Sequence, residues 1–137
     1  MKVWLLRNSF DSSIIGGVFT SAGKKAQEKA LLTEALARRD THIESLRKDI
    51  KIFQEEKEKY IATAVSLLAA DNTADDTYAQ RAIEIDYSYA AEQVRLKQRD
   101  IDLAYNRLYD IARMDNSELL RDYCPKWYWE AYELEGD

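Results

Sequence analysis

The sequence predicts an α+β protein, mainly helical, in which a long antiparallel helical hairpin accompanies a small antiparallel sheet built from both chain ends. Three observations lead to this fold class. Between Lys24 and Pro125 no glycine or proline interrupts the chain, which favours helix. Apolar residues in that stretch recur at alternating spacings of three and four, as in coiled-coil helices. Both ends, residues 2–19 and 126–135, are rich in strand-forming residues.

The first 20 residues predict a β-hairpin. Residues 2–6 and 14–19 are strand-like, and the segment 7–13 between them is rich in turn-forming residues. Gly16 and Gly17 interrupt the second strand, which is typical of a bulge or of a close backbone approach. This pair therefore either bends the hairpin or makes room for a ligand.

A long helix is expected over residues 21–70, with Thr20 or Ser21 as its cap. Eight of the ten positions in its seam are apolar, which predicts a coiled-coil contact. The seam consists of Leu36, Arg39, Ile43, Leu46, Ile50, Phe53, Lys57, Tyr60, Ala64 and Leu67.

The polar segment 71–76 ends this seam and predicts the turn of a helical hairpin. Thr73 followed by Asp76 resembles the capping arrangement at a helix start. The acidic residues lack the spaced ligands and central glycine of a calcium loop, so we expect no metal site here.

A second long helix is expected over residues 77–114, and eight of its nine seam positions are apolar. They are Ile83, Tyr87, Ala90, Val94, Lys97, Ile101, Ala104, Leu108 and Ile111. Two helices of similar length with a short connection predict an antiparallel pair. The polar seam residues Arg39, Lys57 and Lys97 are typical of positions that set register or oligomeric state.

The second helix carries more apolar surface than one partner helix can bury. A further stripe lies outside its seam and is flanked by three tyrosines, so this helix needs a second neighbour: the small sheet or another copy of the chain. We therefore expect a homo-oligomer. The stripe consists of Ile85, Tyr89, Leu96 and Leu103, and the flanking residues are Tyr78, Tyr105 and Tyr109.

A short helix is expected over residues 117–124, and a strand over residues 126–135. A two-stranded hairpin is marginal alone, and the C-terminal segment is the best candidate for its third strand. The two chain ends would then share one sheet, and residues 1–137 would form a single domain.

Catalytic signatures are lacking, so we expect no enzyme and no cofactor. The chain has no glycine-rich phosphate loop, no CxxC pair and no HExxH motif. His42, the only histidine, lies beside the seam and is expected at the surface. Cys124, the only cysteine, excludes an intrachain disulfide and is expected to be a structural thiol.

The charge and hydropathy of the chain limit which classes of partner and which cellular location are expected. The net charge of −5 argues against direct binding to a nucleic-acid backbone. The N-terminal apolar run is too short for a signal peptide, and no run approaches the roughly 20 apolar residues of a membrane span. These features predict a cytoplasmic protein without a membrane partner.

Aromatic and arginine residues near the chain ends are the candidate binding residues. The C-terminal aromatics alternate between both faces of a short strand, so they either form a binding surface or pack in the core. Aromatics beside arginines would suit a nucleotide, with Arg113 and Arg121 as further arginine contributors. The candidates are Arg7, Asn8, Phe10, Arg107, Trp127, Tyr128, Trp129 and Tyr132.

The segment from Trp4 to Leu36 resembles small uncharacterised proteins of phages and bacteria. Their pattern is a strand, a polar loop with Ser and Asp, and then "GVF-S/T-xx-KA-x-x-A"; Gly17-Val18-Phe19-Thr20 match its start, and Lys25-Ala26 and Ala30 follow two and three residues later than the pattern places them. Those proteins often end with an acidic strand similar to residues 132–135. The resemblance implies a phage or mobile-element origin and no enzyme activity, and the expected architecture is similar to phage anti-defence proteins such as anti-CRISPR proteins.

Three functions remain open at this point. The first is a binding protein that inhibits a host defence protein, which should present an exposed patch at the sheet or the hairpin tip. The second is an oligomeric sponge for a cyclic nucleotide signal, which should present a basic, aromatic pocket. The third is a structural or assembly coiled coil, which should present neither. In the first two cases the protein would act in the host-cell cytoplasm.

Overall fold

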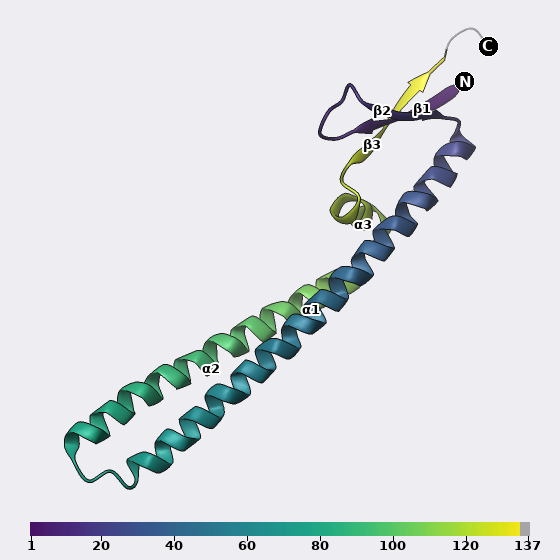
Figure 1. Ribbon diagram of the computed structural model, residues 1–137. Coiled ribbons are helices and arrows are strands. Elements are labelled where there is room, and N and C mark those ends of the chain that lie inside the picture. Colours follow the sequence, from purple (N-terminus) through teal and green to yellow (C-terminus); the bar gives the residue numbers. More distant parts are fainter. Residues whose placement is uncertain (135–137) are drawn as a thin grey trace. The chain divides into compact units, whose positions relative to one another are not determined.

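The computed structural model describes residues 1–134 and confirms the predicted fold class: two long helices pack against each other, and both chain ends form a three-stranded antiparallel sheet (Figure 1). The elements in chain order are β1 (Lys2–Asn8), β2 (Ile15–Phe19), α1 (Ser21–Asp71), α2 (Thr77–Ala112), α3 (Asn116–Tyr123) and β3 (Trp127–Glu133). The last strand was expected to reach residue 135, which lies outside the described residues.

Contacts along the chain group into two compact units. One unit comprises Met1–His42 together with the segment that begins at Arg113, and the other comprises Ile43–Ala112. Helix α1 contributes to both. Among residues 1–134, no helix is long and apolar enough to cross a membrane.

The sheet has the strand order β2-β1-β3, so the central strand pairs with both neighbours. Strand β1 pairs with β3 along its whole length, from Lys2 opposite Glu133 to Asn8 opposite Trp127. On the other side, β1 pairs with β2 through a register shift at Leu6 and Arg7, because Gly16 is an extra residue there. The predicted third strand from the C-terminus is therefore present.

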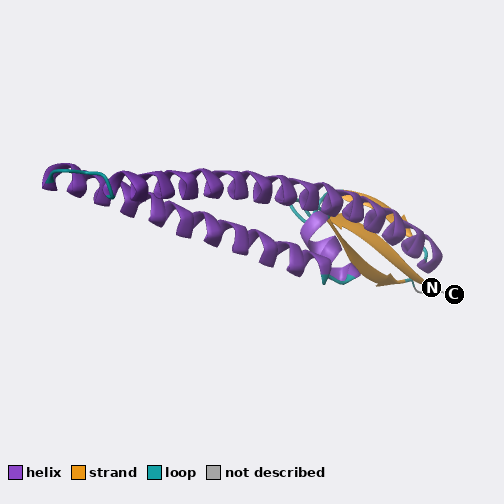
Figure 2. Ribbon diagram, turned by 90° about the horizontal axis from the view of Figure 1, so that it is seen from below, coloured by secondary structure: helices purple, strands orange, loops and turns teal. Residues whose placement is uncertain are grey.

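The inner face of the sheet packs on the first turns of α1 (Figure 2). Phe19 and Trp129 meet edge to face, with ring centroids 5.5 Å apart. The Lys24 ammonium lies 4.2 Å from the Trp4 ring centroid and 5.6 Å from that of Trp129, so cation–π attraction holds α1 against two strands. Thr20 caps α1 by accepting a hydrogen bond from the Gly23 amide at 3.2 Å.

Helix α3 closes a small core against α1. Ala35, Leu119 and Cys124 are buried together there. Asp115 caps α3 by accepting a hydrogen bond from the Glu118 amide at 2.8 Å. His42, expected at the surface, is half-buried, and its Nδ1 lies 2.9 Å from the Tyr123 hydroxyl.

The second unit is the helical hairpin, and every predicted seam position within Ile43–Ala112 is buried or half-buried. Ile50, Ile101 and Ala104 form its core cluster. Both seam lysines bond across the helix pair, since Lys57 donates to the Gln98 carbonyl oxygen at 2.5 Å and Lys97 forms an ion pair with Glu56. These cross-helix bonds favour a single register of the hairpin.

The connection between α1 and α2 is capped differently from our expectation. Asp76 accepts a hydrogen bond from the Ala79 amide at 2.7 Å and so caps α2, while the Thr73 hydroxyl donates to the Ala70 carbonyl at 3.0 Å. Among the described residues, no cluster of three or more histidine, cysteine or acidic side chains is placed to hold a metal ion.

Two isoleucines on the same helix test the seam of the hairpin. Ile50→Ala should lower the free energy of unfolding by about 2–5 kcal/mol, because it removes a buried side chain from the core cluster. Ile52→Ala, at a position that is 49% exposed, should change it by no more than about 0.5 kcal/mol. Urea unfolding followed by circular dichroism measures both, and equal losses would contradict the assigned seam.

Candidate binding surface on the outer face of the sheet

Strand alternation divides the sheet into two faces with different surroundings. Trp4, Leu6 and Trp129 point to the inner face, toward α1. The pairing register places the other half of the strand residues on the outer face. These are Val3, Leu5 and Arg7 from β1, Ile15 and Val18 from β2, and Tyr128, Glu130 and Tyr132 from β3.

Exposed apolar side chains from the outer face and the adjoining β1–β2 loop form one surface, which we call the outer patch. Val18 is 63% exposed, Ile15 47%, Tyr128 41% and Tyr132 40%. Phe10, in the loop, is 81% exposed, whereas Ile14 lies opposite Asn8 and so on the other face from Ile15. Large apolar side chains gathered in this way are unusual on a surface that contacts only water.

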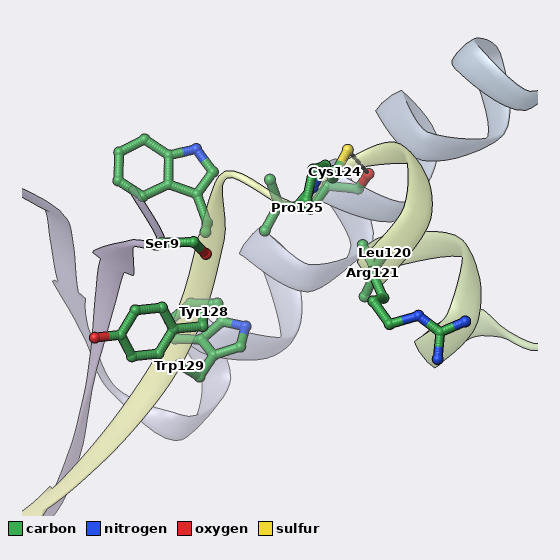
Figure 3. A pocket seen from close by; sticks show the side chains of 9 residues that line it. Ser9, Leu120, Arg121, Cys124, Pro125, Tyr128 and Trp129 are labelled. Atoms are coloured by element: carbon green, nitrogen blue, oxygen red, sulfur yellow. Dashed lines mark hydrogen bonds between the residues drawn. The ribbon is translucent and has the colours of Figure 1, made fainter. Parts of the chain in front are cut away.

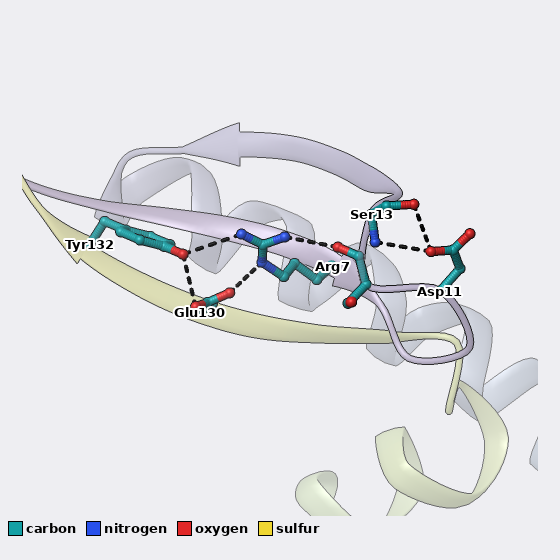
Figure 4. A network of polar contacts seen from close by, with 6 residues as sticks. Arg7, Asp11, Ser13, Glu130 and Tyr132 are labelled. Carbon is teal, nitrogen blue, oxygen red and sulfur yellow. Dashed lines mark hydrogen bonds and ion pairs between the residues drawn. The ribbon is translucent and has the colours of Figure 1, made fainter.

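A polar network around Arg7 occupies the middle of the outer face (Figure 4). The guanidinium pairs with the Glu130 carboxylate, and it donates to the Ser12 carbonyl at 2.8 Å and to the Tyr132 hydroxyl at 3.2 Å. The Tyr132 hydroxyl donates in turn to Glu130 at 2.8 Å. Hydrogen bonds from Tyr132 and Arg7 lower the pKa of Glu130, and those to Tyr132 and Glu130 raise the pKa of Arg7. The cation is thus already neutralised within the chain.

The β1–β2 loop is held by its own polar side chains. Asn8 is buried, and its side-chain oxygen accepts hydrogen bonds from the Phe10 and Asp11 amides at 2.8 and 3.1 Å. Asp11 accepts from the Ser13 hydroxyl and amide, and these bonds lower the pKa of Asp11. Asn8, a predicted binding residue, therefore shapes the loop, while Phe10 is left exposed.

The two glycines of β2 make room for aromatic rings of the chain itself. A Cβ atom at Gly16 would lie 3.0 Å from a ring carbon of Trp127, and one at Gly17 would lie 2.7 Å from the ring of Phe19. The close backbone approach expected at this pair thus serves internal packing. Trp127 and Trp129, two predicted binding residues, are half-buried.

A cavity of about 330 Å³ lies between α1, α3 and the start of β3 (Figure 3). It is mostly apolar; among the described residues that line it, Arg121 carries the only charge, and its guanidinium pairs with Asp122 at 3.0 Å. The Cys124 thiol donates to the Leu31 carbonyl at 3.5 Å, and burial raises the pKa of that thiol. A buried, protonated thiol is a poor nucleophile.

The structure brings only some of the predicted residues together. Phe10, Tyr128 and Tyr132 share the outer patch, with Arg7 at its centre, whereas Arg107 is exposed on α2 in the other unit. Of the predicted packing residues, Ile85, Tyr89 and Leu103 are exposed and Leu96 is half-buried. Sequence reasoning did not identify Ile15 or Val18 as outer-face residues, because the bulge at Gly16 changes which side chains of β2 reach that face.

Comparison with known proteins gives no relative: no family model matches the chain, and neither a curated protein nor a solved structure matches it.

A double-mutant cycle tests the contact between Gly16 and Trp127. Gly16→Ala should destabilise the protein by about 1–3 kcal/mol, because the new methyl group overpacks the indole. In a Trp127→Phe background the cost should fall, since phenylalanine lacks the ring atoms that the methyl group meets. Gly23→Ala, where a Cβ has ordinary contacts of 3.4 Å or more, is the control and should be neutral or stabilising. Equal costs in both backgrounds would contradict the contact.

Proposed function

We propose that this chain is a non-enzymatic binding protein of phage type, which docks a host protein on the outer patch and so inhibits a component of anti-phage defence. The single observation that carries the proposal is the outer patch itself: exposed apolar residues from two strands and the β1–β2 loop around a polar network that is already satisfied. Burying such a surface costs little desolvation free energy, because the guanidinium and carboxylate at its centre keep their hydrogen-bond partners.

The exposed side chains and the charge of the outer patch indicate what kind of partner surface would fit it. Phe10 and Val18 are the most exposed members of the patch, and aromatic anchors of this kind dominate protein–protein interfaces. Asp11, in the β1–β2 loop, adds negative charge beside the patch, and the chain as a whole carries a net charge of −5. A complementary partner has an apolar depression rimmed by lysine or arginine.

Two features favour a protein partner over a nucleotide signal. Arg7, the predicted arginine among the exposed aromatics, is neutralised by Glu130. The cavity beside Trp127 and Trp129 is apolar, and its one arginine pairs with Asp122. Phosphate recognition relies on arginines that are free to make charge-assisted bonds, so a nucleotide sponge is less well supported.

The resemblance of the N-terminal segment to small phage and bacterial proteins supports the choice of a host protein as the partner. The matched segment includes Val18 of the outer patch and the turn into α1. It thus coincides with part of the surface that we assign to binding. The defence component is the most specific part of the proposal and rests on this resemblance.

Two valines of matched exposure provide the test. Val18, in the outer patch, is 63% exposed, and Val65, on α1 in the hairpin unit, is 61% exposed. Immobilised wild-type protein should retain a defined bacterial protein, and Val18→Asp should reduce its retention at least about tenfold, as expected when a charge enters a desolvated contact. Val65→Asp should retain it as the wild type does.

Quantitative pull-down with mass spectrometry is the measurement, and circular dichroism checks that both variants stay folded. Retention that is unchanged in Val18→Asp, or reduced equally in both variants, would refute the outer patch as the docking site. Specific retention of a cyclic nucleotide without any protein would instead favour the sponge.

A further inference from the structure

Helix α2 carries a second apolar surface outside its seam with α1, and one of its members, Tyr89, also meets Tyr60 of α1 edge to face, with ring centroids 6.4 Å apart. Successive members are spaced by seven, four, seven and seven residues, so at 3.6 residues per turn they lie within about 40° of one line. Tyr78 is 90% exposed, Ile85 63%, Tyr89 61% and Leu103 55%, while Leu96 is half-buried. We call these five residues the α2 stripe.

The hairpin unit has a small core for its length. Its buried apolar residues among Ile43–Ala112 are Ile50, Ala90, Ile101, Ala104 and Ile111, of which two are alanines. A pair of helices buries only one face of each helix, and small helical units of this kind gain stability by oligomerisation. The heptad spacing of the α2 stripe indicates that its partner is another helix, because this repeat keeps a seam aligned along a helical neighbour.

We propose that a second copy of this chain packs its α2 stripe against the first in antiparallel orientation, with the two-fold axis level with Leu96. The paired hairpins then form a four-helix assembly. This assembly uses the hairpin unit, so it stands apart from the binding function assigned to the outer patch.

Three members of the α2 stripe, Tyr89, Leu96 and Leu103, are arranged symmetrically about Leu96. Tyr89 precedes Leu96 by seven residues and Leu103 follows it by seven, so Tyr89 faces the partner's Leu103. Two charged residues interrupt the stripe, Glu92 four places before Leu96 and Arg99 three places after it. Antiparallel packing brings Glu92 within one residue of the level of the partner's Arg99, about 1.5 Å along the helix axis, and the two-fold axis repeats this ion pair.

Charge makes the parallel alternative unfavourable. In a parallel pair Glu92 would face its own copy, and so would Arg99, which places like charges opposite each other. Glu92 is held by Arg95 within its helix at 2.5 Å, and a carboxylate has acceptor capacity for a second arginine. Among residues 1–134 the structure gives Arg99 no ion pair, so its guanidinium is free for the partner's Glu92.

Exposure of the α2 stripe suits a contact between two chains. In this register Tyr89 and Leu103, 61% and 55% exposed, cover each other across the pair, and Ile85 lies opposite the partner's Arg107. The flanking charged side chains would supply a polar rim.

Sedimentation velocity from about 1 to 200 µM protein tests the dimer, a range that spans the affinities usual for this interface size. The wild type should sediment as a dimer of the 15.9-kDa chain at the upper concentrations. Tyr89→Glu/Leu103→Glu should raise the dissociation constant at least about 100-fold, because each new carboxylate faces the other across the apolar seam. Ile61→Glu/Leu68→Glu, at exposed apolar positions of α1 that are 40% and 50% exposed, is the control and should stay dimeric.

A charge exchange tests the orientation and register. Glu92→Arg and Arg99→Glu should each weaken the dimer about 3- to 10-fold, and the double variant should return to within about 2-fold of the wild type. The positions substituted in these variants, Tyr89, Glu92, Arg99 and Leu103, are all exposed on α2, so circular dichroism should show unchanged helicity. A monomeric wild type, or a dimer that survives Tyr89→Glu/Leu103→Glu, would overturn the proposal. A double variant as weak as the single variants would overturn the antiparallel register.

Discussion

The pairing of β1 with β3 is the constraint on which the rest of the first unit depends. It joins the first strand of the chain to the last one described, from Lys2 opposite Glu133 to Asn8 opposite Trp127. Closing so long a loop costs chain entropy, which the backbone hydrogen bonds and the aromatic packing on the inner face offset. The same pairing brings Glu130 and Tyr132 beside Arg7, so the polar network of the outer face exists only when both ends are in register.

The two faces of the sheet consequently have different roles. The inner face uses its tryptophans, Phe19 and the Lys24 ammonium to fix the start of α1. The outer face keeps its apolar residues exposed and its charges paired with each other, and this combination suits a protein partner. The hairpin unit has a separate apolar surface on α2, whose heptad spacing and charge order fit a second copy of the chain. Binding and self-association are thus assigned to different units.

Much of this fold was predictable from sequence, because helical seams are local patterns. Every predicted seam position between Ile43 and Ile111 is at least half-buried, and the third strand came from the expected segment. Contacts that depend on register across the sheet were not predictable. Neither the neutralisation of Arg7 by Glu130 nor the fit of Trp127 against Gly16 has a local signal, since each joins residues more than 100 positions apart. The bulge at Gly16 also concealed which side chains of β2 reach the outer face.

Site-specific photo-crosslinking in bacterial cells would test the division between the two surfaces most directly. Benzoylphenylalanine extends the aromatic ring by a benzoyl group that exposed positions can accommodate, and Tyr128 and Tyr89 are 41% and 61% exposed. At position 128, on the outer patch, the account predicts an adduct with a different protein. At position 89, on the α2 stripe, it predicts an adduct of twice the mass of the 15.9-kDa chain. Adducts with the same species at both positions, or a foreign adduct at 89 and none at 128, would contradict it.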